Sequence, residues 1–354
     1  MTATLDFKIT KTQASRLSQV DFDNLPFGTI FSDHMFTADY QQGKWQNPQI
    51  IPFGDLSLSP ATSALHYGQA FFEGMKGFRQ VNGKVAVFRP WKNHARFNKS
   101  ANRMCMPTIP EELFLESLKE LINLDRDWVP HNDNQSLYIR PVMFATEPHL
   151  GVHPSESYKY ILMTCPIGAY FNKNLKVKIE TRYARSCEGG VGFAKNAGNY
   201  AASLYPTTIA QQEGFDQLIW TDAKEHAYIE ETGASNVMFL INNVLITPNT
   251  KETILDGVTR DSVLQLARSW GIEVQERPIP VKEIIDSLQT GKLQEAYGVG
   301  TAAIIAPISE IGYKENLYQL ADPATWTLSK KITQTLNDMR KGLSHDIFSW
   351  NFII

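Results

Sequence analysis

Lys195 stands among small residues in the stretch GFAKNAGNY, residues 192–200, and Tyr200 follows five positions later. A neutral lysine amine is a nucleophile that forms a Schiff base with a carbonyl compound, and burial or a neighbouring cation favours the neutral form. Glycine and alanine neighbours let a bulky flat ligand approach the backbone closely. Taken alone, these nine residues are still more typical of a solvated loop lysine.

A pair of carboxylates lies 35 to 36 positions downstream of this lysine. Glu230 and Glu231 precede a glycine in IEETGASN, residues 229–236. A carboxylate there could act as a general base or hold a proton on a ring nitrogen. A charged turn between two strands is the alternative, and it is favoured while the motif is considered alone.

Two turns rich in small residues could bind a phosphate. DGVTRDS, residues 256–262, opens a predicted helix, and free N–H groups at a helix N-terminus suit an anion. Capping by Thr259 or Asp261 is the equally weighted alternative. GVGTAA, residues 298–303, offers glycines and the hydroxyl of Thr301, or is simply a tight turn. No βαβ unit surrounds GVGTAA, so a dinucleotide site is not supported.

Together, these four stretches match the needs of one cofactor. Pyridoxal 5′-phosphate requires a lysine, an acidic partner for its pyridine nitrogen, and donors for its phosphate. The chain offers a lysine, a carboxylate, a helix opening and a glycine turn in that order. The order therefore favours this cofactor, although each stretch alone is weak.

Further motifs, in the same order as in a known family, resemble the branched-chain amino acid aminotransferases, which are fold-type-IV pyridoxal-phosphate enzymes. The similarity runs from residue 25 to residue 311. Besides the four stretches above, it rests on LPFGTIFSDHM (25–35), LHYGQAFFEGMKGFR (65–79), FRPWKNHARF (88–97), YIRPVMFA (138–145), GAYF (168–171) and YGVGTAAIIAPISEI (297–311). The last residues, SHDIFSWNFII, match the family poorly and receive no role.

The resemblance implies a set of cofactor contacts. Lys195 is the catalytic residue, which binds the cofactor covalently and moves the proton between the substrate and the cofactor. Tyr200 contacts the phenolate oxygen and Glu231 contacts the ring nitrogen. The implied phosphate contacts are Arg96, the N–H groups of Val258 and Thr259, and Thr301.

The resemblance also implies how the substrate is bound. Tyr138 and the Thr301-Ala302 turn take the α-carboxylate, and Arg140 meets the distal carboxylate of glutamate. Leu150 and Val152 enter the side-chain pocket from the partner subunit of a homodimer. The walls of the pocket are Phe27, Tyr67, Phe72, Tyr138 and Tyr170.

The expected reaction is reversible transfer of an amino group between L-leucine, L-isoleucine or L-valine and 2-oxoglutarate. The implied fold consists of two α/β domains with the active site between them. Alternatives within the fold are a D-amino-acid aminotransferase and an aminodeoxychorismate lyase, but the LHY, FFEG and YIR motifs argue against both. A non-catalytic cofactor-binding homologue is a further alternative, against which the intact Lys195 and Glu231 argue.

Composition excludes several other classes. The chain has 354 residues, a formal net charge of −3 and a pI of about 6.3, so no general basic field is available for nucleic acid. No apolar run reaches the roughly 18 residues of a membrane span, and no secretory signal is evident. The three cysteines fit free thiols in a reducing cytoplasm, and the scattered histidines predict no metal site.

The predicted elements indicate a mixed α/β (α+β) class. Asn82-Gly83 and Asn242-Asn243 are predicted to turn two hairpins, within 78–89 and 235–248. Amphipathic spacing predicts helices within 111–129, 257–271 and 325–343. We expect a smaller N-terminal domain over 1–165, an interdomain loop over 166–178, and a larger C-terminal domain over 179–354 that carries the cofactor lysine.

Overall fold

The chain folds into two compact units in a computed structural model that describes residues 7–168 and 173–354. Unit 1 comprises Met1–Tyr170, Ala194–Ala197 and Asp338–Ile354. Unit 2 comprises Phe171–Phe193 and Gly198–Asn337.

This division differs from the expected domains in two segments. The first boundary, after Tyr170, falls inside the expected loop 166–178. The Lys195 segment and the C-terminal residues, however, belong to unit 1, which is the larger of the two. Residue spacing could not show this, because both segments join unit 1 through strand pairing with residues more than 100 positions away. Asn196 forms a bridge with Phe71, and β19 (Asn351–Ile353) pairs with β6 (Val85–Phe88).

Unit 1 is built on a nine-stranded sheet. Its strands run in the order β1-β3-β2-β8-β7-β5-β6-β19, with β4 paired to β7, and all pairs are antiparallel except β1 with β3. The remaining strands are β1 (Lys8–Ile9), β2 (His34–Gln41), β3 (Lys44–Pro52), β4 (Ala70–Phe72), β5 (Met75–Arg79), β7 (Ser136–Ala145) and β8 (Tyr158–Ile167).

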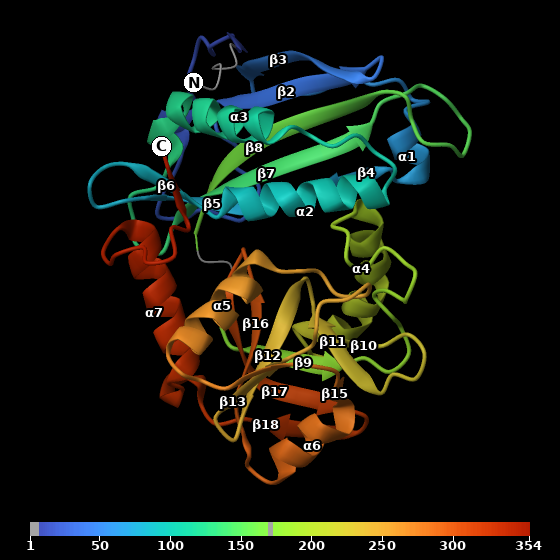
Figure 1. Cartoon of the computed structure of the whole chain (residues 1–354), viewed down its shortest axis with the longest axis vertical. Helices are drawn as coiled ribbons and strands as arrows, with labels where there is room; N and C mark the ends of the chain where they lie inside the picture. The colour runs from blue at the N-terminus through green and yellow to red at the C-terminus, as the bar shows by residue number, and fades with distance from the viewer. Residues whose placement is uncertain (1–6, 169–172) are drawn as a thin grey trace. The chain divides into compact units, whose positions relative to one another are not determined.

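Two helices cover one face of this sheet, α2 (Pro90–Arg103) and α3 (Glu111–Leu124), as Figure 1 shows. The helix predicted within 111–129 is confirmed as α3, and its apolar face, Phe114, Leu118, Leu121 and Ile122, is buried in the core of unit 1. The shorter helices are α1 (Ser63–Tyr67), η1 (Leu17–Gln19) and η2 (Arg126–Trp128). The predicted hairpin at Asn82-Gly83 is also confirmed: β5 pairs with β6, and Gly83 has a φ of 80°.

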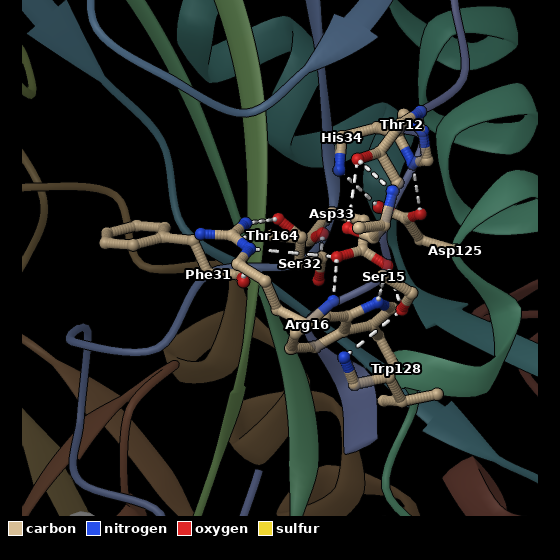
Figure 2. Close-up of polar contacts among 12 residues, drawn as sticks. Thr12, Ser15, Arg16, Phe31, Ser32, Asp33, His34, Asp125, Trp128 and Thr164 are labelled. Carbon is tan, nitrogen blue, oxygen red and sulfur yellow. Dashed lines mark hydrogen bonds and ion pairs between the residues drawn. The ribbon is translucent and has the colours of Figure 1, made fainter. Parts of the chain in front are cut away.

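The buried carboxylate of Asp33 joins the N-terminal segment to the rest of unit 1, as Figure 2 shows. Asp33 accepts hydrogen bonds from the Ser15 hydroxyl at 2.5 Å, the Arg16 backbone N–H at 2.9 Å and the Trp128 indole N–H at 3.0 Å. Burial alone would raise the pKa of Asp33, but these hydrogen bonds and the Arg16 charge outweigh it and lower the pKa.

The next residue, His34, extends this network to α3. Its backbone N–H and its Nδ1 bind the two oxygens of Asp125 at 2.9 and 2.6 Å. Its Nε2 accepts the backbone N–H of Thr12 at 2.9 Å. Because Nε2 accepts, the ring proton is on Nδ1 and is donated to Asp125. The network therefore joins the segment at residues 12–16 to β2 and to the C-terminal end of α3.

Unit 2 contains a ten-stranded sheet in the order β14-β13-β12-β16-β17-β9-β10-β11-β15. An additional pairing of β11 with β12 closes the central strands into a ring, and β18 pairs with β17. The strands are β9 (Leu175–Ile179), β10 (Gln217–Thr221), β11 (Tyr228–Thr232), β12 (Ser235–Ile241), β13 (Val244–Thr247), β14 (Val274–Glu276), β15 (Ile279–Pro280), β16 (Leu293–Gly300), β17 (Ile304–Tyr313) and β18 (Asn316–Gln319).

Local sequence signals in unit 2 are confirmed. Asn242 and Asn243 turn the hairpin between β12 and β13 with φ values of 49° and 65°. The two predicted helices appear as α5 (Val258–Ser269) and α7 (Leu328–Lys341), and the others are α4 (Ala197–Gln212), α6 (Val281–Gln289) and η3 (Pro323–Thr325). The apolar face of α7 is buried through Leu328, Ile332, Leu336 and Met339, and the last residues of α7, from Asp338 on, belong to unit 1.

The described residues bear on the expectations about membrane spans and about the cysteines. No helix among them is long and apolar enough to cross a membrane. All three cysteines are free thiols, with Cys165 buried and Cys105 and Cys187 exposed.

Replacing Asp33 by asparagine tests the N-terminal network. An amide offers only one oxygen to three donors, so Asp33→Asn should lower the free energy of unfolding by about 2 kcal/mol at pH 7. Native-state hydrogen exchange of the slowest amides of β2 measures this. Because the folded pKa of Asp33 is lowered, its contribution is present above the unfolded value near 3.8 and is lost as the pH falls below it. The matched change at the exposed Asp55 should have little effect; equal effects would contradict the role of Asp33.

Candidate active site

Lys195 is held against β4 by its backbone. Its N–H donates to the Ser100 hydroxyl at 3.0 Å, and its carbonyl accepts the Phe72 N–H at 3.1 Å. The next residue, Asn196, forms a bridge with Phe71. These contacts fix where the lysine side chain begins, and its Nζ lies 4.9 Å from the centre of the Phe72 ring.

The small neighbours of Lys195 are partly explained by packing in unit 2. A Cβ placed on Gly192 would lie 2.4 Å from the Thr253 carbonyl oxygen and 2.6 Å from the Ser186 Cβ. Any side chain at residue 192 would therefore displace this backbone. The small side chains around Lys195 suggested a nearby ligand. At Gly192, however, the packing of the fold also requires a residue without a side chain.

A buried ion pair lies beside Lys195. Glu73 is fully buried, and Arg96 donates to it from Nε at 2.6 Å and from Nη2 at 2.8 Å. Asn93 adds a hydrogen bond at 2.8 Å. Burial would raise the pKa of Glu73, but the charge and hydrogen bonds of Arg96, the charge of Lys195 and the Asn93 bond together lower it. The carboxylate is thus a fixed negative charge within electrostatic range of the Lys195 amine.

The ion pair gives Arg96, whose expected role was to contact a phosphate, a second partner in Glu73. Arg96 was expected to reach a phosphate, and the structure engages two of its nitrogens with Glu73. Sequence reasoning gave Glu73 no role, although it lies in the FFEG motif that supported the resemblance. The motif was the available signal, but the pairing joins residues 23 positions apart on different elements and has no local pattern.

Four of the expected substrate residues form one connected cluster in unit 1. The Phe27 and Tyr138 rings meet edge to face at 5.0 Å between centroids. Arg140 donates to the Tyr138 hydroxyl at 2.9 Å, and its guanidinium lies 4.3 Å from the centre of the Phe72 ring. Because Lys195 contacts the same ring, Phe72 links the lysine to Arg140. Tyr138 and Arg140 are two residues apart on β7, so their side chains lie on the same face of the strand.

Gly74 makes room for this cluster. A Cβ on Gly74 would lie 2.3 Å from the Tyr138 hydroxyl oxygen, which is closer than real Cβ contacts allow. The Arg140 Nε is buried and has no hydrogen-bond partner among the residues that the structure describes. A buried guanidinium nitrogen without a partner is costly, and it suits an acceptor supplied by a ligand.

Other expected substrate residues lie on the surface of unit 1. Tyr67 ends α1 and is 45% exposed. Leu150 and Val152, in the loop between β7 and β8, are 64% and 89% exposed. Tyr170 lies outside the described residues.

Unit 1 also contains a lysine with a lowered pKa, Lys76. Burial of the Lys76 amine, together with the positive charge of Arg340, lowers the pKa of Lys76 to about 7. A lysine of this kind is a nucleophile candidate by the same reasoning that singled out Lys195. Lys76 lies on β5, three residues after Glu73, and sequence reasoning did not identify it.

In unit 2, Glu231 is buried, and both of its carboxylate oxygens have hydrogen-bond partners. Arg185 binds its Oε2 through Nε at 2.6 Å and also through Nη2. Asn236 and the Leu255 backbone N–H bind its Oε1 at 2.9 and 3.2 Å. Neither Arg185 nor Asn236 was predicted from the sequence. The neighbouring Glu230 has its pKa raised, mainly by burial, so the two adjacent carboxylates occupy different environments.

The same cluster extends to the predicted phosphate-binding residues of unit 2. Asn236 also donates to the Leu255 carbonyl at 2.9 Å, just before α5 begins at Val258. Gly257 is the N-cap, and a Cβ there would lie 2.0 Å from the Asn236 Oδ1. Gly257, which has no side chain, therefore occupies the N-cap position of α5.

The register of the sheet places the turn at residues 298–303 close to Glu231 and Asn236. Glu231 pairs with Asn236 across β11 and β12, and Asn236 pairs with Val299 across β12 and β16. Thr301 and Ala302 follow at the end of β16 and turn the chain into β17. The carboxylate, the helix opening and the threonine turn are therefore assembled by one edge of the closed ring. Tyr200 lies in the first turn of α4 and is half-buried.

The donor set of unit 2 fits a phosphorylated pyridine. A helix N-terminus and a threonine hydroxyl suit a phosphate, and a buried carboxylate suits a protonated ring nitrogen. Gly257 must lack a Cβ for this arrangement to pack. The residues present are therefore compatible with pyridoxal 5′-phosphate.

Comparisons with known proteins agree with this chemistry. The sequence profile of the family described as Amino-transferase class IV matches residues 70–311. Branched-chain-amino-acid aminotransferase 2 of Bacillus subtilis is 43% identical over 334 residues, which cover 93% of this chain and 92% of that protein.

Solved structures show the same fold. The branched-chain amino acid aminotransferase of Escherichia coli superimposes with a TM-score of 0.74 at 24% identity, over 90% of this chain and 98% of that chain. The branched-chain amino acid aminotransferase of Thermobaculum terrenum, in its PLP-form, gives a TM-score of 0.72 at 19% identity, over 90% of this chain and 97% of that chain. The expected fold class is thereby confirmed.

Breaking the Glu73–Arg96 pair tests its structural role. Glu73→Gln and Arg96→Met should each lower the free energy of unfolding by about 3–5 kcal/mol, because each leaves a buried charge without its main partner. The double variant should lose less than the sum of the two, since it removes both charges. Native-state hydrogen exchange measures all three, with the exposed Glu112→Gln on α3 as control. Additive losses would show that the two side chains act independently.

Proposed function

This chain belongs to the branched-chain-amino-acid aminotransferases of the amino-transferase class IV family, and on this premise we propose its substrates, cofactor and residue roles. It transfers an amino group reversibly between L-leucine, L-isoleucine or L-valine and 2-oxoglutarate. Pyridoxal 5′-phosphate is the cofactor. The observation that carries the proposal is the contact of Lys195 and Arg140 with one aromatic ring, Phe72, at 4.9 and 4.3 Å.

The cofactor, when bound, supplies an electron-withdrawing ring that stabilises negative charge at the substrate carbon next to nitrogen. Lys195 would hold the cofactor covalently, and once the substrate amine has replaced it, its freed amine would move the proton at that carbon.

The side chains of unit 2 hold the ring and the phosphate. Glu231 keeps a proton on the ring nitrogen, and Arg185 and Asn236 fix the orientation of its carboxylate. Tyr200 donates to the phenolic oxygen of the ring. The phosphate would be bound by the N–H groups of Val258 and Thr259 and by Thr301, and Arg96 of unit 1 would add a further contact.

The substrate is selected by burial and by one cation. Aromatic walls favour a branched aliphatic side chain at about 0.8 kcal/mol for each buried CH₂ group. Arg140 receives the distal carboxylate of glutamate, which would otherwise be buried without a partner. Tyr138, Thr301 and Ala302 take the α-carboxylate. The pocket walls are Phe27, Tyr67, Phe72, Tyr138 and Tyr170.

We further propose that the enzyme acts as a cytoplasmic homodimer in branched-chain amino acid biosynthesis. Leu150 and Val152 are exposed apolar side chains, and exposed side chains of this kind suit a subunit contact in which they complete the partner's pocket. Free thiols at all three cysteines suit a reducing compartment.

An amino-donor screen tests the function. With pyridoxal 5′-phosphate and 2-oxoglutarate, the three branched-chain L-amino acids should yield glutamate faster than any D-amino acid. Lys195→Ala should reduce turnover by about 1000-fold or more, because the proton-moving group is lost. Lys92→Ala, at an exposed lysine of α2, is the control. Preferred use of D-amino acids, or normal turnover in Lys195→Ala, would contradict the proposal.

Arg140→Leu separates the two substrate types. Losing a charge-assisted contact worth about 3 kcal/mol should slow the half-reaction with glutamate by about 100-fold. The half-reaction with leucine should change far less, because leucine brings no distal carboxylate. Stopped-flow measurement of cofactor absorbance, with each amino acid alone, gives both rates. Arg140→Lys, which keeps the charge without the planar fork, should recover part of the glutamate rate. Equal losses for leucine and glutamate would assign Arg140 a structural role.

A further inference from the structure

Three ligand-type side chains converge in the loop between β7 and β8. Glu147, His149 and His153 each offer one atom, and these atoms lie within 4.8 Å of one another. The Glu147 Oε1 is 4.0 Å from the His149 Nδ1 and 3.9 Å from the His153 Nε2. This is the one such group among residues 7–168 and 173–354. We call it the loop cluster.

Hydrogen bonds at the rear of the loop cluster determine which atoms face its centre. The His153 Nδ1 lies 2.9 Å from the Pro154 carbonyl oxygen, which can only accept. The Nδ1 of His153 therefore carries a proton, and its Nε2 presents a lone pair toward Glu147 when the ring is neutral. The Glu147 Oε2 accepts the Glu156 backbone N–H at 2.8 Å, which leaves Oε1 directed at the histidines.

This arrangement is the one expected of metal ligands. A histidine that binds a metal usually donates its second ring N–H to a carbonyl, and a carboxylate ligand is itself hydrogen-bonded. Both features are present here. Without a cation between them, an imidazole lone pair and a carboxylate oxygen repel each other.

The backbone also keeps the two rings close. The His149 and His153 rings meet at 90°, with centroids 4.6 Å apart. A Cβ on Gly151, midway between them, would lie 2.8 Å from the His149 Nε2 and 3.5 Å from the His153 Cδ2. Glycine at residue 151 therefore permits the approach of the two imidazoles.

We propose that the loop cluster binds one divalent transition-metal ion of the zinc type. Two imidazoles and one carboxylate, with water in a fourth position, are borderline ligands that suit Zn²⁺ or Co²⁺, whereas Mg²⁺ and Ca²⁺ prefer oxygen ligands alone. Tetrahedral coordination at about 2.0–2.1 Å places ligand atoms about 3.3 Å apart. Rotation of the exposed histidine side chains can supply the small contraction that this requires.

The bound ion would cross-link residues 147, 149 and 153 and thereby fix the loop. The two ends of the loop are already attached to unit 1: the Glu147 carbonyl accepts the Ser63 N–H at 2.9 Å, and the Thr146 N–H donates to the Ser157 carbonyl at 2.9 Å. The exposed centre, Leu150 to Val152, lies between the two histidines. The ion would restrict this centre most strongly.

Sequence reasoning predicted no metal site, because the spacing Glu-x-His-x₃-His lies in a loop and matches no regular ligand motif. The convergence depends on the turn at Gly151 and on the Pro154 and Glu156 backbone. These are features of the folded loop, and residue spacing does not reveal them.

Cobalt binding to the chelator-treated full-length protein tests the site. One equivalent of Co²⁺ should give the visible absorption of a four-coordinate ion, and Zn²⁺ should displace it while Mg²⁺ should not. Loss of hydrogen bonds behind a ligand already weakens metal binding about 10–100-fold, so His149→Gln, His153→Gln and Glu147→Gln should each weaken it by about 100-fold or more. His131→Gln, at an exposed histidine outside the loop cluster, should bind like the parent protein.

Hydrogen exchange supplies a second readout that does not depend on activity. Zn²⁺ should slow exchange of the amides between Glu147 and His153 in the parent protein and in His131→Gln, but not in His153→Gln. Two results would overturn the proposal. One is no cobalt spectrum with metal in excess over protein, in which case a proton alone bridges the histidines and Glu147. The other is binding that is equally strong in the three loop-cluster variants and in the control.

Discussion

A carboxylate removed from water must be matched by donors, and this constraint organises both units. Glu73, Glu231 and Glu295 are all less than 5% exposed. Glu73 is matched by Arg96 and Asn93, and Glu231 by Arg185, Asn236 and the Leu255 N–H. Glu295 accepts the backbone N–H groups of Thr327, Leu328 and Ser329 and so begins α7. Two of these three pairings lie among residues proposed to act on the cofactor, and the third is structural.

The Glu73 arrangement explains why a short segment of the chain joins unit 1. Residues 194–197 are separated in sequence from the rest of unit 1, yet their backbone pairs beside β4, directly before Glu73. The lysine therefore starts from a rigid strand edge and lies near a fixed negative charge. Packing against Thr253 and Ser186 explains the glycine at residue 192, two positions before this segment. The C-terminal strand β19 is attached to unit 1 in a similar way, by pairing with β6.

Sequence patterns predicted what depends on neighbours along the chain. The Asn-Gly and Asn-Asn turns gave the correct hairpins because both residues tolerate positive φ, and the helix faces followed from the spacing of apolar residues. The patterns missed what depends on long-range contact: Glu73 as the partner of Arg96, Arg185 as the partner of Glu231, the β19 pairing, and the place of Lys195 in unit 1. They also missed the altered pKa of Lys76, because its cause, burial near Arg340, arises only in the folded chain.

Lys195, and no other lysine, is proposed to carry the cofactor, and Lys76 is the alternative that the structure itself provides. The most direct measurement is borohydride reduction of the protein with bound pyridoxal 5′-phosphate, followed by peptide mapping of the pyridoxyl group. We expect the label on Lys195, in the peptide that contains GFAKNAGNY. Label on Lys76, in the peptide that contains FFEGMKGFR, would contradict the proposal and would transfer the covalent role to the lysine whose pKa is about 7.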